Sequence, residues 1–141
     1  MALTIGPRLQ AFFGEVLPAI VTTLNERGQP EMTPVWYEYA DGCIWFNGDK
    51  SRKWLGRMER SGRATFFLLD PKNAWRWAQV WGRVLEVSDD PGGQHIDRLA
   101  QRYRGTRYGA AGRDTRRKAK VAITAVKGAD GSPRERWDVT R

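Results

Sequence analysis

The sequence predicts a mainly β protein with helical additions, folded as a small antiparallel barrel. Three observations support this class. Short runs rich in β-branched and aromatic residues recur along the 141 residues, turn residues separate them, and a few other segments have helical spacing. About six strands in meander order are too many for an open hairpin sheet and suit a closed barrel. No repeat or linker interrupts the chain, so we expect a single domain over residues 1–141.

The first predicted element is a helix over residues 7–17, because apolar residues recur there on one helical face. They are Leu9, Phe12, Phe13, Val16 and Leu17. Pro18 should end this helix. A strand over 19–24 and a turn over 25–30 follow, and Gly28 can adopt the positive φ that the turn needs.

The next predicted strands cover residues 31–39 and 43–46, and Asp41-Gly42 between them is a strong hairpin signal. A helix over 51–62 breaks the β pattern. Its apolar residues are Trp54, Leu55 and Met58. Ser51 is expected as its N-cap and Gly62 as its end.

Two further strands are predicted over residues 63–70 and 77–88, with Gly82 marking a bulge or a close approach of backbone. Asp90-Pro91 then starts a helix. The apolar face of this helix contains Ile96, Leu99, Ala100 and Tyr103. A glycine-rich basic loop over 104–120 precedes the last strands, at 121–126 and 136–139.

Charge and cysteine content restrict the function classes. Lysine and arginine (24) exceed aspartate and glutamate (16), so the formal net charge is +8 and anionic partners are favoured. Cys43 is the single cysteine, so we expect no internal disulfide and no metal site, in a reducing compartment. The N-terminus does not resemble a signal peptide, and no apolar run approaches the roughly 20 residues of a membrane span. We therefore expect a cytoplasmic protein with no membrane insertion.

A basic run at residues 50–53 could bind an anion. Lys50, Ser51, Arg52 and Lys53 lie where a strand ends and a helix begins, so backbone N–H groups and cationic side chains could converge on one phosphate. The alternative is that Ser51 only caps the helix and the cations face water. The tract from Arg102 to Lys120 offers a similar choice, because it is either a solvated loop or a grip for an anionic tail or a nucleic-acid backbone.

Five tryptophans lie in or beside the predicted strands: Trp36, Trp45, Trp75, Trp77 and Trp81. Most of them should fill the barrel wall, with one or two left at the rim to flank a planar ligand. His95 is the only histidine and is expected on the surface. No nucleophile motif and no glycine-rich phosphate loop is present, so we predict no catalytic side chain and expect a bound cofactor to carry any chemistry.

The order of segments resembles the pyridoxamine-phosphate-oxidase-like split barrels. The resemblance covers nearly the whole chain and rests on "AIVTTLNERGQPEMTPVWYEYADGCIWFNG", the "SRK" helix start, "VWGRVLEV" and "HIDRLAQRYRG". It is greatest to the actinobacterial branch that binds flavin or the deazaflavin coenzyme F-420. This chain has Asn47, Gly56 and Ser61-Gly62 where relatives commonly have threonine, asparagine and Asp-Pro.

The resemblance implies a six-stranded antiparallel split barrel that forms a homodimer, with two cofactors at the subunit interface. It implies that Thr33, Pro34, Val35 and Trp36 border the cofactor ring, and that Lys50, Ser51 and Lys53, with Asn47 and Arg52 beside them, hold the phosphate. Trp77 and Gln79 would approach from the partner subunit. The implied function is an oxidoreductase that passes a hydride from F-420 (first choice) or FMN (second choice) to a small conjugated substrate. The alternatives are a single-stranded nucleic-acid-binding barrel and a non-catalytic barrel that sequesters a cofactor or another flat ligand.

Overall fold

A computed structural model describes residues 3–132 and 136–140 of the chain. The strands are β1 (Thr4–Ile5), β2 (Ala19–Leu24), β3 (Pro30–Val35), β4 (Tyr37–Ala40), β5 (Cys43–Asp49), β6 (Arg63–Leu69), β7 (Arg76–Asp89), β8 (Arg116–Asp130) and β9 (Val139–Thr140). The helices are α1 (Pro7–Phe13), α2 (Lys53–Ser61), the 3₁₀ turn η1 (Pro91–Gly93) and α3 (Gln94–Arg104).

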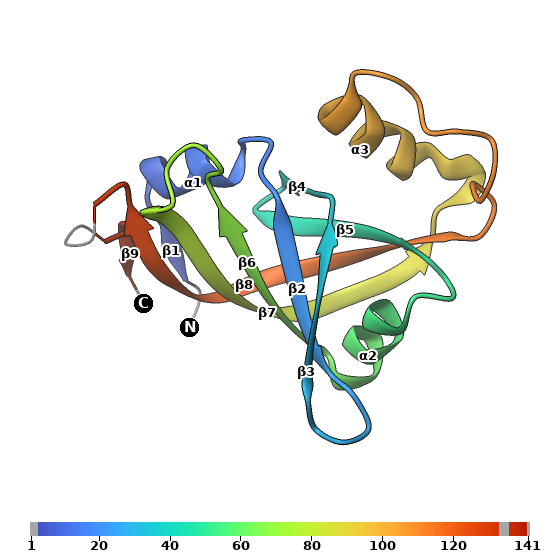
Figure 1. Ribbon diagram of the computed structural model, residues 1–141, viewed down its shortest axis with the longest axis horizontal. Coiled ribbons are helices and arrows are strands. Elements are labelled where there is room, and N and C mark those ends of the chain that lie inside the picture. Colours follow the sequence, from blue (N-terminus) through green and yellow to red (C-terminus); the bar gives the residue numbers. More distant parts are fainter. Residues whose placement is uncertain (1–2, 133–135, 141) are drawn as a thin grey trace.

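The main sheet is antiparallel, with strand order β3-β2-β6-β7-β8-β5-β4. This confirms a mainly β fold, with somewhat more strands than predicted. The prediction of one strand over 31–39 is wrong, because the strand is interrupted at Trp36. The two parts, β3 and β4, lie at opposite edges of the sheet (Figure 1). The simple meander is also wrong, since β5 pairs with β8 while α2 carries the chain across to β6. The sheet therefore curls on itself and splits at Trp36.

The core lies inside the curled sheet and beneath α1 and α2. Phe46 of β5 packs edge-to-face on Phe66 of β6, with ring centroids 5.0 Å apart. Phe12 and Phe13 of α1 are fully buried, and so is Tyr37, whose hydroxyl donates to the Phe13 carbonyl at 2.9 Å. Burial raises the pKa of Tyr37, so the phenol keeps its proton and the hydrogen bond.

Two helix boundaries differ from the sequence prediction. Helix α1 ends at Phe13 rather than Leu17, because the chain turns at Gly14 to reach β2. Helix α2 begins at Lys53 with Arg52 at its cap, so the prediction that Ser51 is the N-cap is wrong. The predicted end is confirmed, since Gly62 is left-handed with φ of 69°.

Strands β7 and β8 pair antiparallel along most of their length, although η1, α3 and a loop separate them in the chain. The predicted irregularity at Gly82 is confirmed: the register shifts between Trp81 and Gly82, and a Cβ on Gly82 would lie 2.3 Å from Val121 Cγ1. Strand β8 begins at Arg116, so the basic segment is a loop only up to residue 115 and its last part is strand. Of the predicted strand over 136–139, only Val139 is paired, and with Thr140 it forms β9.

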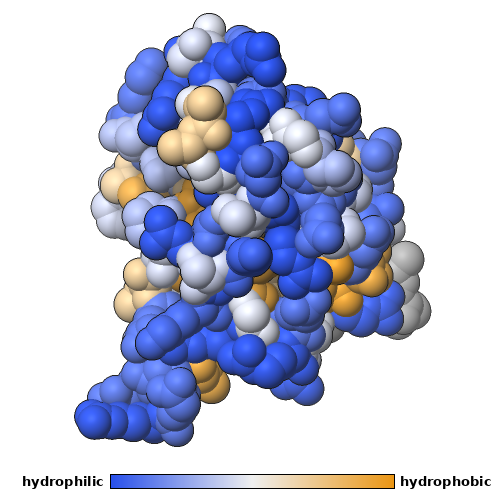
Figure 2. Space-filling model, turned by 90° about the vertical axis from the view of Figure 1, so that its right-hand side faces the viewer, coloured by the Kyte–Doolittle hydropathy of each residue, from blue (hydrophilic) through white to orange (hydrophobic). Residues whose placement is uncertain are grey.

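Helix α3 buries its predicted apolar face, with Ile96, Leu99 and Ala100 at most 2% exposed, and polar contacts also attach it to the barrel. Arg102 donates Nε to the Tyr37 carbonyl at 3.1 Å and Nη1 to the Gly14 carbonyl at 3.1 Å, and the Tyr103 hydroxyl donates to the Leu17 carbonyl at 2.7 Å. The side of the molecule that carries α2 and α3 is mostly hydrophilic (Figure 2). Among the described residues, no helix combines the length and the apolar character that a membrane crossing needs.

Candidate functional site

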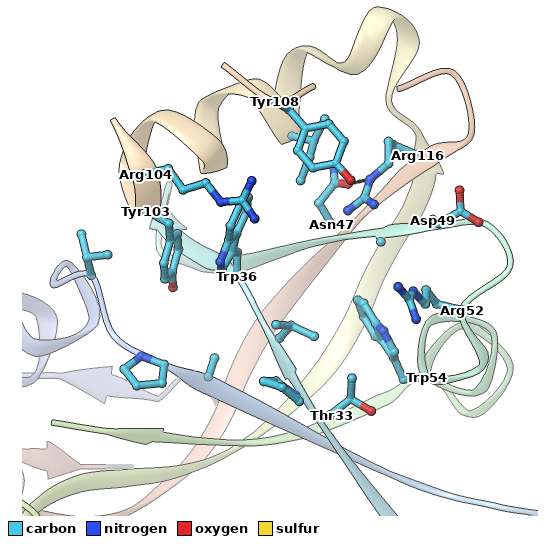
Figure 3. A pocket seen from close by; sticks show the side chains of 17 residues that line it. Thr33, Trp36, Asn47, Asp49, Arg52, Trp54, Tyr103, Arg104, Tyr108 and Arg116 are labelled. Atoms are coloured by element: carbon cyan, nitrogen blue, oxygen red, sulfur yellow. Dashed lines mark hydrogen bonds between the residues drawn. The ribbon is translucent and has the colours of Figure 1, made fainter. Parts of the chain in front are cut away.

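A groove of about 720 Å³ opens between the barrel and α3. One wall is the end of β3, the floor is the end of β5, and Trp54 of α2 lines the groove together with Arg52 just before that helix (Figure 3). The upper wall is α3, the loop after it and the start of β8. The volume is within the range of pockets that hold cofactors and other small molecules. The interruption between β3 and β4 at Trp36 separates the two strands and leaves room for this groove.

Aromatic rings border the groove on its α3 side. The ring of Trp36 stacks on Tyr103, with centroids 5.3 Å apart and planes 10° apart. The Arg104 guanidinium lies 4.8 Å from the centroid of the Trp36 ring, and Tyr108 lines the groove from the following loop. Flat, conjugated ligands stack favourably on such rings.

Three arginines line the groove: Arg52, Arg104 and Arg116. None of them forms an ion pair with another described residue, whereas nearby Arg113 pairs with Asp97 and Arg117 pairs with Glu59. Burial lowers the pKa of Arg116, and the positive charge of Arg52 lowers it further. Two unpaired cations close enough to repel each other favour an anion between them.

Asp49 is the only carboxylate among the residues that line the groove, and it is already occupied by neutral donors. It accepts hydrogen bonds from the Ser51 hydroxyl, from the Ser51 backbone N–H at 2.9 Å, and from the Thr115 hydroxyl. The Ser51 hydroxyl, followed by that of Thr115, lowers the pKa of Asp49 well below its usual range. This carboxylate therefore holds the turn into α2 and leaves the arginines free.

The structure brings about half of the predicted site residues together. Those that line the groove are Thr33, Pro34, Val35, Trp36, Asn47 and Arg52. The side chains of Lys50 and Lys53 are exposed beside it, and Ser51 is bound to Asp49. That Lys50, Ser51 and Lys53 hold a phosphate remains a prediction.

Trp77 and Gln79 lie on β7, outside the groove of their own chain. Trp77 stacks on Phe67 with centroids 5.5 Å apart, and Gln79 lines a separate hollow of about 270 Å³ together with Ile20 and Met32. This hollow is on the outer face of the sheet, where the Met32 side chain is 70% exposed. Within one chain, these two residues could not reach a ligand in the groove.

Two sequence predictions about this region are wrong. His95 is not a surface residue, because it is 5% exposed at the start of α3 and its Nε2 lies 3.0 Å from Glu38 Oε1 of β4. The five tryptophans of the strands do not fill the core either: Trp75 is exposed and the other four are half-buried. The buried tryptophans are Trp54 and Trp137. Tryptophan therefore borders this barrel's surfaces more than it fills the interior.

Sequence reasoning did not assign Tyr103, Arg104, Tyr108 and Arg116 to the site. Only the excess of arginine between residues 102 and 120 pointed to them, and it could not separate Arg116 from Arg113 and Arg117, which are already ion-paired. The groove offers rings, guanidinium groups and hydroxyls, and no histidine or cysteine lines it. Its residues can hold and orient a flat, anionic ligand.

Comparison with known proteins identifies the family. Residues 5–134 match the model of the family described as Pyridoxamine 5'-phosphate oxidase. No curated protein matches the chain. A solved structure named F420 Reductase superposes with a TM-score of 0.76 at 21% identity, covering 83% of this chain and 94% of its own.

Two further structures have the same fold. A conserved hypothetical protein of Mycobacterium tuberculosis has a TM-score of 0.67 at 19% identity, with 96% of this chain and 86% of that chain covered. HupZ of Group A Streptococcus has a TM-score of 0.62 at 16% identity, with 87% and 92% covered. The family match extends over nearly the whole chain and agrees with the split sheet and its groove. The chain belongs to the pyridoxamine 5'-phosphate oxidase-like family of split β-barrels.

Proposed function

We propose that this protein is an oxidoreductase that binds the deazaflavin coenzyme F-420, or FMN as second choice, in the groove and reduces a small conjugated substrate. The observation that carries the proposal is the pairing of an aromatic wall with three arginines that have no carboxylate partner among the described residues. The bound coenzyme would supply the hydride chemistry. The chain itself would bind and orient the ring, neutralise its anionic part and exclude water.

The residues present fit such a coenzyme. Strand β3 is an edge strand, so the backbone groups on its outer side have no partner strand and can bind the polar edge of a flat ring. Arg52 and Arg116 lie at the other end of the groove, where β5 meets α2 (Figure 3). The coenzyme would then occupy both ends of the groove, with its ring against β3 and its phosphate near Arg52 and Arg116.

Charge favours F-420 over FMN. The oligoglutamate tail of F-420 is polyanionic, whereas FMN ends at one phosphate. The chain has a net charge of +8, and Arg104 is exposed at the α3 side of the groove without an ion-pair partner in the described part of the chain. A polyanionic tail would interact with more of this surplus charge than a single phosphate.

The proposed site includes a second copy of the chain. The outer sheet face around Gln79 is partly apolar and contains the exposed Met32 and the half-buried Trp77 and Phe67. Covering it in a two-fold dimer would bury this surface. It would also allow Trp77 and Gln79 of one copy to approach the groove of the other.

Spectroscopy of the purified protein is the decisive experiment. A flavin or deazaflavin absorption band, followed by titration with FMN and F-420, shows which coenzyme binds. Oxidation of the reduced coenzyme in the presence of conjugated acceptors then tests turnover. Tight binding without turnover would favour a cofactor-sequestering protein. Binding of single-stranded oligonucleotides with no affinity for either coenzyme would refute the proposal and support the nucleic-acid alternative.

A further inference from the structure

Three polar or charged residues of the described chain are buried when backbone and side chain are taken together, and all three belong to one cluster. Asn47 at the end of β5 is 5% exposed, Asp90 before η1 is 2% exposed and His95 at the start of α3 is 5% exposed. Buried polar groups cost desolvation free energy unless they are hydrogen-bonded. Because this cluster costs desolvation free energy and lies beside the groove, we expect it to have a function in ligand binding.

The hydrogen bonds of Asn47 determine its orientation. Its Nδ2 donates to Asp90 Oδ2 at 3.0 Å, and its Oδ1 accepts from Arg116 Nε at 2.8 Å (Figure 3). A flipped amide would place oxygen against the Asp90 carboxylate and N–H against the guanidinium, so this orientation is the only one with both bonds. The Asn47 side chain is thus a fixed acceptor for Arg116.

This orientation also assigns the tautomer of His95. The second Nδ2 hydrogen of Asn47 points at His95 Nδ1, 3.0 Å away, so Nδ1 accepts and the ring proton is on Nε2. Nε2 in turn lies 3.0 Å from Glu38 Oε1, to which it donates. The imidazole is therefore a neutral link between β4 and the Asn47 amide.

Helix capping explains only part of the cluster. Asp90 accepts backbone N–H bonds from His95 at 2.8 Å and Ile96 at 2.9 Å, which stabilise the start of α3. Neither the Asn47 amide nor the His95 ring takes part in capping. Apolar side chains could fill their space without desolvating polar groups. The Asn47 amide adds the bond to Arg116, and the His95 ring adds one bond to Glu38 and a second bond to the Asn47 amide.

Arg116 uses one of its three nitrogens in this bond. Its guanidinium lies 5.2 Å from the centroid of the Tyr108 ring, and its two terminal nitrogens make no hydrogen bond or ion pair with any residue that the structure describes. A half-buried cation held at Nε presents its terminal N–H groups as a fork, which matches two oxygens of a phosphate.

We propose that Arg116 binds the phosphate of the ligand in the groove, and that Asn47, Asp90 and His95 are positioning residues that aim it. This inference rests on the proposed function, since it concerns the anionic end of the same ligand. Asn47 acts on Arg116 directly. His95 does not line the groove and acts through Asn47.

The test compares ligands with and without the phosphate. FMN and riboflavin share a ring, and F-420 can be compared with its ring lacking the phosphate-linked tail. In Arg116→Gln the preference for the phosphorylated ligand should fall about ten- to a hundredfold, with riboflavin affinity unchanged. In His95→Phe, which keeps an aromatic ring but has no acceptor, it should fall about two- to tenfold. The double variant with both His95→Phe and Arg116→Gln should have the same preference for the phosphorylated ligand as Arg116→Gln alone.

His95→Asn is the matched control, because its side-chain oxygen can accept near the position of Nδ1. It should restore the preference that His95→Phe loses, which a general loss of packing would not do. A preference for FMN in His95→Phe equal to that of the wild type would overturn the positioning role. Equal affinities of the wild type for FMN and riboflavin would overturn the role of Arg116 and leave coenzyme binding intact.

A readout without coenzyme separates this inference from the proposed function. The Arg116 Nε–H signal in NMR spectra of the apo protein should be protected from exchange in the wild type and in His95→Asn, and should lose protection in His95→Phe. Inorganic phosphate should shift this signal in the wild type. If neither coenzyme binds, the proposed function fails, and the phosphate titration still decides: a shift that His95→Phe weakens supports the inference, and no shift overturns it.

Discussion

Replacing Glu38 with glutamine should weaken the attachment of α3 in a pH-dependent way. Glu38 is on β4, and its carboxylate accepts from His95 Nε2 at 3.0 Å and from Arg98 Nε at 3.1 Å, both on α3. Tyr103 and Arg104 of the groove belong to the same helix. Glu38→Gln keeps the shape of the side chain and removes its charge, so it isolates the electrostatic part of this contact.

The magnitude follows from the pKa of Glu38. Burial would raise this pKa, but the hydrogen bonds from His95 and Arg98 outweigh burial and lower it from 4.5 to about 2. Because the folded protein binds this proton less tightly than the unfolded chain, the carboxylate stabilises the fold above pH 4.5. That contribution, at most about 3 kcal/mol, is lost as the pH falls towards 2.

Urea unfolding at pH values from about 7 down to about 2.5 measures the effect. The unfolding free energy of Glu38→Gln should lie about 2–3 kcal/mol below that of the wild type at neutral pH, and the difference should shrink as Glu38 protonates. Glu26→Gln, in the exposed turn between β2 and β3, is the control and should show no such difference. A Glu38→Gln difference that is absent at neutral pH, or constant at every pH, would refute the reasoning.

Four further substitutions test other parts of the structure. Gly82→Ala should lower the unfolding free energy by about 1–3 kcal/mol, because its Cβ would lie 2.3 Å from Val121 Cγ1; an unchanged urea midpoint would contradict this. Met32→Glu, at a side chain 70% exposed on the outer sheet face, should convert the proposed dimer into a folded monomer in sedimentation, and a persisting dimer would place the interface elsewhere. Lys53→Ala and Arg52→Ala should each weaken coenzyme binding by about 1.5–3 kcal/mol without changing the apo Tm; normal binding by Lys53→Ala with a lowered Tm would make Lys53 structural.

Local patterns in the sequence were sufficient to predict most of the helices and strands. Alternating β-branched and aromatic residues located β2 and β6, Asp41-Gly42 located the β4–β5 hairpin, and Gly62 marked the end of α2. These features depend on backbone preferences and burial periodicity within a few residues. The resemblance to a known family added the split barrel and the segment at Thr33–Trp36.

The tertiary structure decided the strand order, the groove and its cations. Nothing local indicates that the chain breaks at Trp36, since this follows from closing the sheet with β3 and β4 at opposite edges. The arginines of the basic tract look equivalent in sequence, yet Arg113 has a carboxylate partner and Arg116 has none in the part of the chain that the structure describes. The burial of His95 likewise depends on β4 and β5 packing beneath α3. Free energies of ion pairing and desolvation depend on distances between residues far apart in the chain, and only the folded structure brings those residues together.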